Sequence, residues 1–217
     1  MHTKHFSLNT KGTDYFVGDL HGCYDKFKST LVDVNFDIKK DRVFSVGDLI
    51  DRGPDSQKCL ELLDERWFHC VLGNHECFML GIYAQDWFRN GGDWIGKTPQ
   101  SILNSDIKLV KEKCYQTLTV DTQYGKIGIV HAESENDWNY NNEFTLELNT
   151  WSRSRFRYGY RNLIENIDLV IVGHQPMKEI VLLGNVLNID TGAVYEDRGG
   201  FLTLINAKQA FDFLSAK

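Results

Sequence analysis

The chain has 217 residues, of which 42% are hydrophobic and 25% charged, and its formal net charge is −6 at pH 7. This length suits a single domain over residues 1–217 with a substantial core, and no apolar run approaches the roughly 20 residues that a membrane-spanning helix requires. The acidic balance argues against a nucleic-acid-binding protein, which would usually be basic, but it does not exclude an anionic substrate bound through metal ions.

The N-terminus and the cysteines favour a cytoplasmic location. Residues 1–7 lack the apolar stretch of a secretory signal. The cysteines are odd in number and form no Cys-x-x-Cys pair, so reduced, buried thiols are expected rather than disulfides or a thiolate zinc site. They are Cys23, Cys59, Cys70, Cys77 and Cys114. We expect a cytoplasmic monomer.

The first predicted strand follows a polar lead-in over residues 1–11. An apolar run over residues 15–17 ends at Gly18-Asp19-Leu20-His21-Gly22. Asp19 and His21 can turn toward one point and form half of a metal site. Alternatively, Asp19 caps the amphipathic helix that the apolar spacing predicts over residues 23–34.

The next two predicted strands end in the same way. Residues 43–46 precede Gly47-Asp48-Leu49-Ile50-Asp51-Arg52-Gly53, and residues 68–72 precede Gly73-Asn74-His75-Glu76. A helix is predicted after each of these motifs, over residues 54–63 and residues 77–88, with proline in the first turn of the former. This alternation of strands and helices indicates parallel βαβ units.

Residues 77–116 are predicted to form a helical insertion with a break at Asn90-Gly91-Gly92-Asp93. Trp87 and Trp94 bracket the break. They could form a wall that faces the substrate, but packing within the helical layer is favoured, because aromatic side chains commonly anchor buried layers.

Three further strand ends carry polar residues in the second half of the chain. Residues 168–213 as a whole are predicted to form short strands joined by turns. The Asp190 motif is interpreted as a structural turn and is left out of the site. The apolar runs end at His131, Gly173-His174 and Asp190-Thr191-Gly192.

Residues 132–168 are irregular, polar and aromatic, and they contain Arg153. A solvated loop with snorkelling arginines and a nucleic-acid surface are both conceivable interpretations. A loop that covers an anionic substrate is favoured, because the chain as a whole is acidic.

The repeated strand ends predict a site for two divalent metal ions. In an open α/β sheet, ligands gather outside the carboxyl ends of the strands. Carboxylate, amide and imidazole donors without thiolate suit Mn²⁺, iron or zinc better than Ca²⁺. Two ions roughly 3.5–4 Å apart can generate hydroxide from a shared water for in-line attack on a phosphoester. One ion is expected at Asp19, His21 and Asp48, and the second at Asp48, Asn74, His131 and His174.

Neighbouring residues can perform the remaining chemistry. Arg52 and Arg153 are the candidates to bind phosphoryl oxygens, which favour bidentate cationic donors. His75 can protonate the departing alkoxide while Asp51 orients its ring. Glu76 is interpreted as a support for the site or for the helix N-terminus rather than as a ligand.

The motifs that begin at Gly18, Gly47 and Gly73 together resemble the three-part signature of the phosphoprotein phosphatases, within the calcineurin-like metallophosphoesterases. The stretches at His131-Ala132, Trp151-Ser152-Arg153-Ser154-Arg155, Gly173-His174-Gln175-Pro176 and Ile189-Asp190-Thr191-Gly192-Ala193-Val194 are similar to compact phage lambda and bacterial members. The resemblance covers residues 15–205. It implies a central β-sandwich flanked by helices rather than one open sheet, and a manganese-activated phosphatase of phosphoserine, phosphothreonine and often phosphotyrosine. By motif position it supports the ligands, phosphate clamps and acid pair named above.

The sequence departs from this family at Leu72, where the protein phosphatases usually have arginine. Leucine is more similar to the symmetrical dinucleotide tetraphosphatases, although these tend to lack the aspartate at position 51. Gln175 replaces a more usual threonine. The favoured hypothesis is a phosphatase of phosphorylated proteins, peptides and small phosphoesters. The alternatives are a dinucleotide tetraphosphate hydrolase and a non-catalytic metal-binding scaffold, which would be expected to lack a ligand or the acid.

Overall fold

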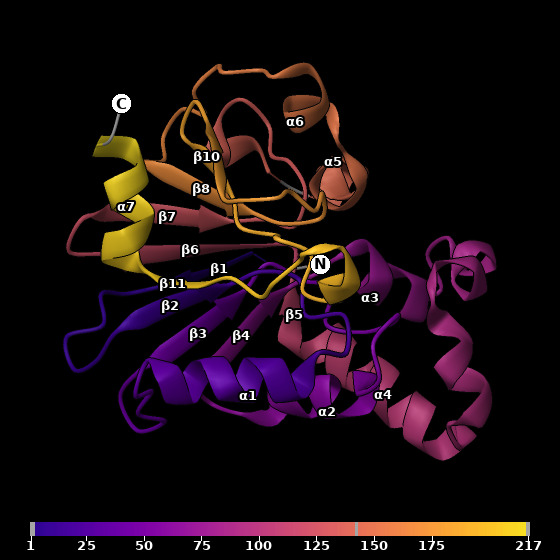
Figure 1. Cartoon of the computed structure of the whole chain (residues 1–217). Coiled ribbons are helices and arrows are strands. Elements are labelled where there is room, and N and C mark those ends of the chain that lie inside the picture. The colour runs from indigo at the N-terminus through magenta and orange to yellow at the C-terminus, as the bar shows by residue number, and fades with distance from the viewer. Residues whose placement is uncertain (1–2, 142, 216–217) are drawn as a thin grey trace.

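The computed structural model describes residues 3–141 and 143–215, and Figure 1 shows two stacked β-sheets with helices on their outer sides. In the five-stranded sheet, β2 to β5 run parallel, and β11 lies antiparallel to β2 at the edge. Ser45 is the register partner of both Val17 and Cys70, so β2, β3 and β4 end at the same edge. The strands, in sheet order, are β11 (Leu204–Asn206), β2 (Asp14–Val17), β3 (Arg42–Ser45), β4 (Phe68–Val71) and β5 (Cys114–Tyr115).

The six-stranded sheet is mixed. Its central strands β7, β8 and β10 run parallel, and Ile129 lies opposite Ile171. The segments that follow β7 and β8 therefore also emerge together. In sheet order, the strands are β1 (Thr3–Phe6), β6 (Thr117–Thr122), β7 (Gly125–Ile129), β8 (Leu169–Val172), β10 (Val186–Asn188) and β9 (Val181–Leu183).

The main core lies between the two sheets. Phe16, Phe44 and Val71 of the smaller sheet pack in one buried cluster with residues of the larger sheet such as Ile129 and Ile171. Strands buried on both faces require nearly continuous apolar sequence, which explains the apolar runs that end at polar motifs.

Most helices cover the outer faces, whereas the C-terminal helix packs through Ala210 against the core between the sheets. Phe27 of α1 and Leu60 of α2 pack with Val43 in a second core on the smaller sheet. On the larger sheet, Trp138 and Ile164 of the irregular segment cover Val170. The α-helices are α1 (Tyr24–Asp33), α2 (Ser56–Glu61), α3 (Asn74–Met79), α4 (Gln100–Lys113), α5 (Leu146–Trp151), α6 (Ser154–Tyr158) and α7 (Ala207–Ser215).

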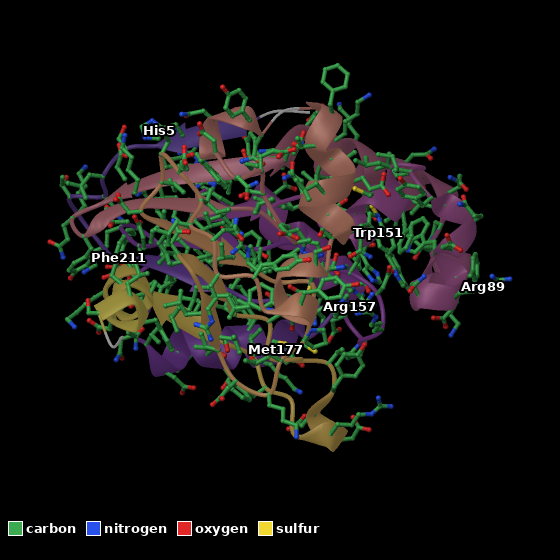
Figure 2. The ribbon with its side chains drawn as sticks, turned by 90° about the horizontal axis from the view of Figure 1, so that it is seen from above. His5, Arg89, Trp151, Arg157, Met177 and Phe211 are labelled. Atoms are coloured by element: carbon green, nitrogen blue, oxygen red, sulfur yellow. The ribbon has the colours of Figure 1, made fainter. Side chains whose placement is uncertain are left out.

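Short 3₁₀ helices lie in the connecting segments. The run η2 to η4 forms a lobe beside the sheets, and Figure 2 shows its Arg89 at one end of the molecule, opposite the end at which His5 and Phe211 lie. The 3₁₀ helices are η1 (Leu62–Asp64), η2 (Ala84–Asp86), η3 (Phe88–Asn90), η4 (Gly92–Lys97), η5 (Trp138–Tyr140), η6 (Glu143–Thr145) and η7 (Glu196–Arg198).

The two sheets confirm the β-sandwich that the family resemblance implies, and they show that the prediction of one open sheet was wrong. The strand-helix rhythm of the first half correctly indicates parallel strands. The second half instead forms its own sheet, because β6 turns back on β7 as a hairpin and both sheets bury an apolar face in the interface.

Three local predictions were also wrong. The polar lead-in contains β1, an edge strand whose exposed residues carry no apolar alternation. The helix predicted over residues 77–88 is α3, which begins at Asn74 and ends at Met79, because Gly81 and Tyr83 adopt left-handed backbone angles with φ of 85° and 57°. The strands predicted over residues 168–213 end with β11, and the last predicted residues belong to the helix α7.

All five cysteine thiols are free and buried. Within the described ranges, no helix is long and apolar enough to cross a membrane.

Candidate active site

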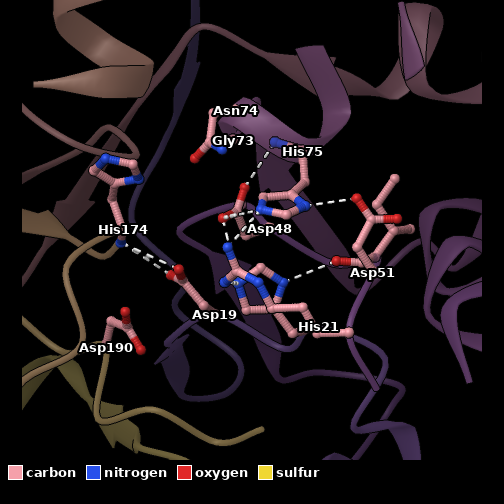
Figure 3. Close-up of polar contacts among 12 residues, drawn as sticks. Asp19, His21, Asp48, Asp51, Gly73, Asn74, His75, His174 and Asp190 are labelled. Atoms are coloured by element: carbon pink, nitrogen blue, oxygen red, sulfur yellow. Dashed lines mark hydrogen bonds and ion pairs between the residues drawn. The ribbon is translucent and has the colours of Figure 1, made fainter. Parts of the chain in front are cut away.

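The carboxyl ends of β2, β3, β4, β7 and β8 meet at one edge of the sandwich, where the predicted ligand side chains approach one another (Figure 3). Each of these side chains comes from the segment directly after a strand, so the sheet register sets its position. All of them are at most 5% exposed: Asp19, His21, Asp48, Asn74, His131 and His174.

Asp48 lies at the centre of this cluster. Its Oδ2 is 3.5 Å from His21 Nε2, and its Oδ1 is 3.4 Å from His131 Nε2. Among the described residues, two groups have donor atoms close enough to hold a metal ion, and both include Asp48. These groups are His21, Asp48 and His75, and Asp48, His131 and His174.

The imidazole rings are fixed by backbone carbonyls. His21 Nδ1 donates to Ile50 O at 2.8 Å, and His131 Nδ1 donates to Val46 O at 2.7 Å. These hydrogen bonds leave each Nε2 with a lone pair that faces the cluster, which is the arrangement found in metal-binding histidines. Asn74 Oδ1 lies 3.2 Å from His131 Nε2 and adds an amide oxygen to the same donor set.

Asp19 lies beside these groups, and both of its carboxylate oxygens are 3.2 Å from the His174 backbone nitrogen, which donates to them. Burial and the charge of Asp190 raise the pKa of Asp19 well above its usual range.

Asp190, which sequence reasoning set aside as a turn, does accept a turn hydrogen bond from Gly192 N at 2.9 Å. Its carboxyl group is also buried beside Asp19 (Figure 3), and burial raises its pKa to about 6. The sequence signal for this third carboxyl was its place at a strand end.

The electrostatics of the cluster fit a divalent cation. Burial alone would raise the pKa of Asp48, but the facing His131 and His75 lower it well below its usual range. Burial and His131 lower the pKa of His174 to about 3, so this ring is a neutral acceptor. A buried carboxylate such as Asp48 is costly unless a cation compensates it, and this mixed donor set suits a divalent metal.

Two arginines approach the cluster. Arg52 reaches His21 Nε2 and lies 2.9 Å from His75 Nε2, while Arg153 Nε donates to His174 Nε2 at 3.1 Å. The guanidinium groups therefore face the ring nitrogens of two predicted metal ligands, His21 and His174. The structure brings both predicted phosphate clamps to the cluster, although they are 101 positions apart in the sequence.

The predicted acid pair is fully buried. His75 Nδ1 donates to Asp51 Oδ2 at 2.6 Å. The same carboxylate accepts the indole N–H groups of Trp87 and Trp94, a contact that sequence reasoning missed when it assigned these residues to packing. Their only sequence signal was the position on either side of a glycine break.

Backbone strain is concentrated at this site. Asp48, Asp51, Arg52 and His174 adopt left-handed φ values of 50°, 74°, 69° and 69°. Non-glycine residues in this region are uncommon and usually mark a functional constraint.

Glu76 and Leu72 contribute to the surroundings of the site. Glu76 accepts backbone N–H groups from Asp48, Leu49 and Gly73, which agrees with its interpretation as a support. Leu72 is 2% exposed and packs in the core beneath the helices. It therefore supplies no charge to the site where the protein phosphatases usually have arginine.

Clustered oxygen and imidazole donors next to two guanidinium groups suit a divalent metal ion that acts on a phosphorylated substrate. The class of protein defined by this arrangement is a metal-dependent phosphoesterase. The chain belongs to the calcineurin-like phosphoesterase family, since the model of that family matches residues 15–198.

Relatives of two kinds resemble the chain. It is 36% identical over 197 residues to serine/threonine-protein phosphatase 1 of Salmonella typhimurium, covering 88% of this chain and 89% of the relative. It is 33% identical over 190 residues to the symmetrical bis(5'-nucleosyl)-tetraphosphatase of Wigglesworthia glossinidia brevipalpis, covering 83% and 68%.

A solved protein serine/threonine phosphatase from Saccharomyces cerevisiae shares the fold. Its TM-score is 0.66 at 13% identity, and the match covers 92% of this chain and 74% of that one. This likeness supports the sandwich architecture.

Proposed function

We propose that the protein is a manganese-dependent phosphatase of phosphoserine and phosphothreonine in proteins, with phosphotyrosine and small phosphoesters as further substrates. The observation that carries this proposal is the buried contact of 2.6 Å between His75 Nδ1 and Asp51 Oδ2, beside Arg52. A serine or threonine alkoxide is a poor leaving group, so its ester profits from a general acid placed in this way. The phosphatase relatives support the same substrate class.

The proposed metal ligands are the residues at the strand ends. Asp19, His21 and Asp48 would hold one ion, and Asp48, Asn74, His131 and His174 the other. The fit rests on the buried, mixed donor set, which Mn²⁺, iron and zinc would all accept. When bound, the two ions would supply Lewis acidity and a nucleophile from water at neutral pH.

Side chains of the chain itself would bind the phosphate and protonate the leaving group. Arg52 and Arg153 would bind phosphoryl oxygens from two sides, with the fork geometry that suits phosphate. His75 would give the proton on Nε2 to the departing oxygen. Asp51 would hold Nδ1 and stabilise the imidazolium. A general acid is usually worth roughly 10²–10⁴-fold in rate.

A second candidate function is symmetrical hydrolysis of dinucleotide tetraphosphates. Leu72 and the relative from Wigglesworthia favour it. The presence of Asp51 favours the protein phosphatase, because the tetraphosphatases tend to lack this residue. A non-catalytic scaffold is disfavoured, because each expected ligand type and the acid pair are present.

The test measures phosphate release by chelator-stripped protein re-supplied with Mn²⁺. A phosphoserine peptide and diadenosine tetraphosphate are offered at equal concentration. We expect faster turnover of the peptide. Preference for the dinucleotide would assign the protein to the second function. If the metal-bound protein turned over neither substrate, the non-catalytic scaffold would become the favoured interpretation.

We further propose that the enzyme works as a single-domain monomer in the cytoplasm. The five free, buried thiols support a reducing compartment.

A further inference from the structure

The Asp51 carboxylate is held by three hydrogen-bond donors. Oδ2 accepts from His75 Nδ1 at 2.6 Å and from Trp87 Nε1 at 2.8 Å, while Oδ1 accepts from Trp94 Nε1 at 2.6 Å. Asp51 is fully buried. A buried carboxylate that lacks such partners is strongly disfavoured, so the two indole N–H groups bear directly on its position and charge.

Both tryptophans point inward from the lobe formed by η2 to η4. Trp87 is 7% exposed, whereas its neighbour Phe88 is 61% exposed. The two indoles meet edge to face, with ring centroids 6.5 Å apart at 81°. The indole edges that carry the N–H groups thus converge on a single carboxylate. Packing alone does not require both donors to reach the same side chain.

The backbone of the lobe is tied to the same place. Arg52 N donates to Gly91 O at 3.2 Å, and Gly91 has a φ of 100°. A Cβ at Gly92 would lie 2.3 Å from Trp87 Cδ1, so the glycine allows the chain to pass directly against the indole. The lobe therefore contacts Asp51 through side chains and Arg52 through the main chain.

These contacts fall on two consecutive residues in left-handed conformations, Asp51 and Arg52. Such conformations persist only where the surroundings hold them. In this chain the lobe supplies much of that restraint, together with Ser56 Oγ, which accepts from Asp51 N at 2.9 Å.

We propose that Trp87 and Trp94 are positioning residues for leaving-group protonation. Their N–H groups hold the Asp51 carboxylate against His75 Nδ1, so that His75 Nε2 faces the substrate oxygen. This inference rests on the proposed acid role of His75, and it assigns to the lobe a part in the reaction rather than in packing alone.

The test replaces the indoles by phenylalanine, which keeps an aromatic ring and removes the N–H donor. Trp87→Phe, Trp94→Phe and the double variant are assayed with Mn²⁺ on a phosphoserine peptide and on 4-nitrophenyl phosphate. Nitrophenolate departs without a proton, so its ester does not need the acid. We expect the double variant to lose about 10–10²-fold in kcat on the peptide, part of the usual worth of a general acid, and less than about twofold on the nitrophenyl ester.

Trp67→Phe is the matched control. Trp67 Nε1 also donates to a carboxylate, Glu65 Oε2 at 3.0 Å, but it packs beneath α1 with Phe27 and Phe36. We expect this variant to retain both activities. Metal content is measured for every variant, so that a loss of metal is not mistaken for a loss of the acid.

His75→Asn separates failure of this inference from failure of the acid assignment. A selective loss on the peptide in His75→Asn, together with equal losses on both substrates or no loss in the tryptophan variants, would overturn the positioning role alone. An unselective effect of His75→Asn would overturn the acid assignment and, with it, the inference. Selective losses in both sets of variants support the proposal.

Discussion

Glu76 connects two segments of the site, residues 48–49 after β3 and Gly73 at the start of α3. Its Oε1 accepts from Leu49 N at 2.8 Å, and its Oε2 accepts from Asp48 N at 2.8 Å and Gly73 N at 2.9 Å. Burial and the neighbouring Asp48 raise its pKa to about 7. The side chain thus fixes the backbone on both sides of the central carboxylate, Asp48.

Glu76→Gln tests this role. The glutamine side chain ends in one oxygen and one NH₂ group. The NH₂ group must face a backbone N–H group from which a carboxylate oxygen accepts a hydrogen bond in the wild type. We expect the free energy of unfolding of the metal-free protein to fall by about 2–3 kcal/mol, because a buried N–H group loses its acceptor and faces another donor. Urea denaturation measures the effect. Glu61→Gln makes the same change at an exposed position and should stay within about 0.5 kcal/mol of wild type. Equal stability of both variants would contradict the role assigned to Glu76.

At the scale of elements, the 3₁₀ lobe is where sequence patterns predicted least. The apolar spacing around residues 77–88 suggests a continuous helix, but α3 ends at Met79 and three short 3₁₀ helices follow. The glycines at positions 91 and 92 are packed against Arg52 and Trp87, whereas Gly96 meets nothing within 4 Å. The first two glycines are therefore required by tertiary contacts, which local sequence cannot reveal.

Gly92→Ala and Gly96→Ala form a matched pair within η4. The added methyl at Gly92 collides with the Trp87 ring and should displace its hydrogen bond to Asp51. We expect Gly92→Ala to destabilise the protein by about 1–3 kcal/mol, as overpacking usually does. Gly96→Ala should be neutral or stabilising by up to about 1 kcal/mol, because alanine restricts the unfolded chain. Thermal denaturation compares them, and equal melting temperatures would show that the ring is not held closely.

At the scale of the whole molecule, the sequence predicts well which residues follow each strand. It predicts poorly how the strands are divided between the two sheets. Ligand types such as Asp48 and His131 stand at the ends of apolar runs, so the sequence identifies them, but they follow strands of different sheets and converge only because the two sheets pack together. The assignment of strands to two sheets depends on long-range pairing, and only the family resemblance anticipated it. The edge strand β1 carries no alternating pattern because successive residues, which point to opposite faces of the strand, are exposed to solvent. The contact of Asp51 with Trp94 spans 43 positions, which no local motif encodes.

His69 connects the two sheets away from the metal cluster. Its ring lies in β4, with centroids 4.3 Å from Phe6 of β1 and 5.2 Å from Phe44 of β3. Burial, together with the nearby Lys4 and Arg42, lowers its pKa to about 3, against a usual value of 6.5. The ring is therefore neutral in the folded protein throughout the mildly acidic range.

Because the pKa of His69 is lowered in the folded protein, the free energy of unfolding should decrease at acidic pH. Between pH 6.5 and about pH 3 the unfolded state binds the His69 proton and the folded state does not, so stability is lost as the pH falls through that window. His69→Phe keeps an aromatic ring between the sheets and removes the titration. We expect the free energy of unfolding of the variant, relative to wild type, to rise by about 2–3 kcal/mol between pH 8 and pH 4.5. Urea unfolding at several pH values measures it. A difference that stays constant with pH would mean that His69 is protonated in the folded sandwich and that its contact with Phe6 tolerates the charge.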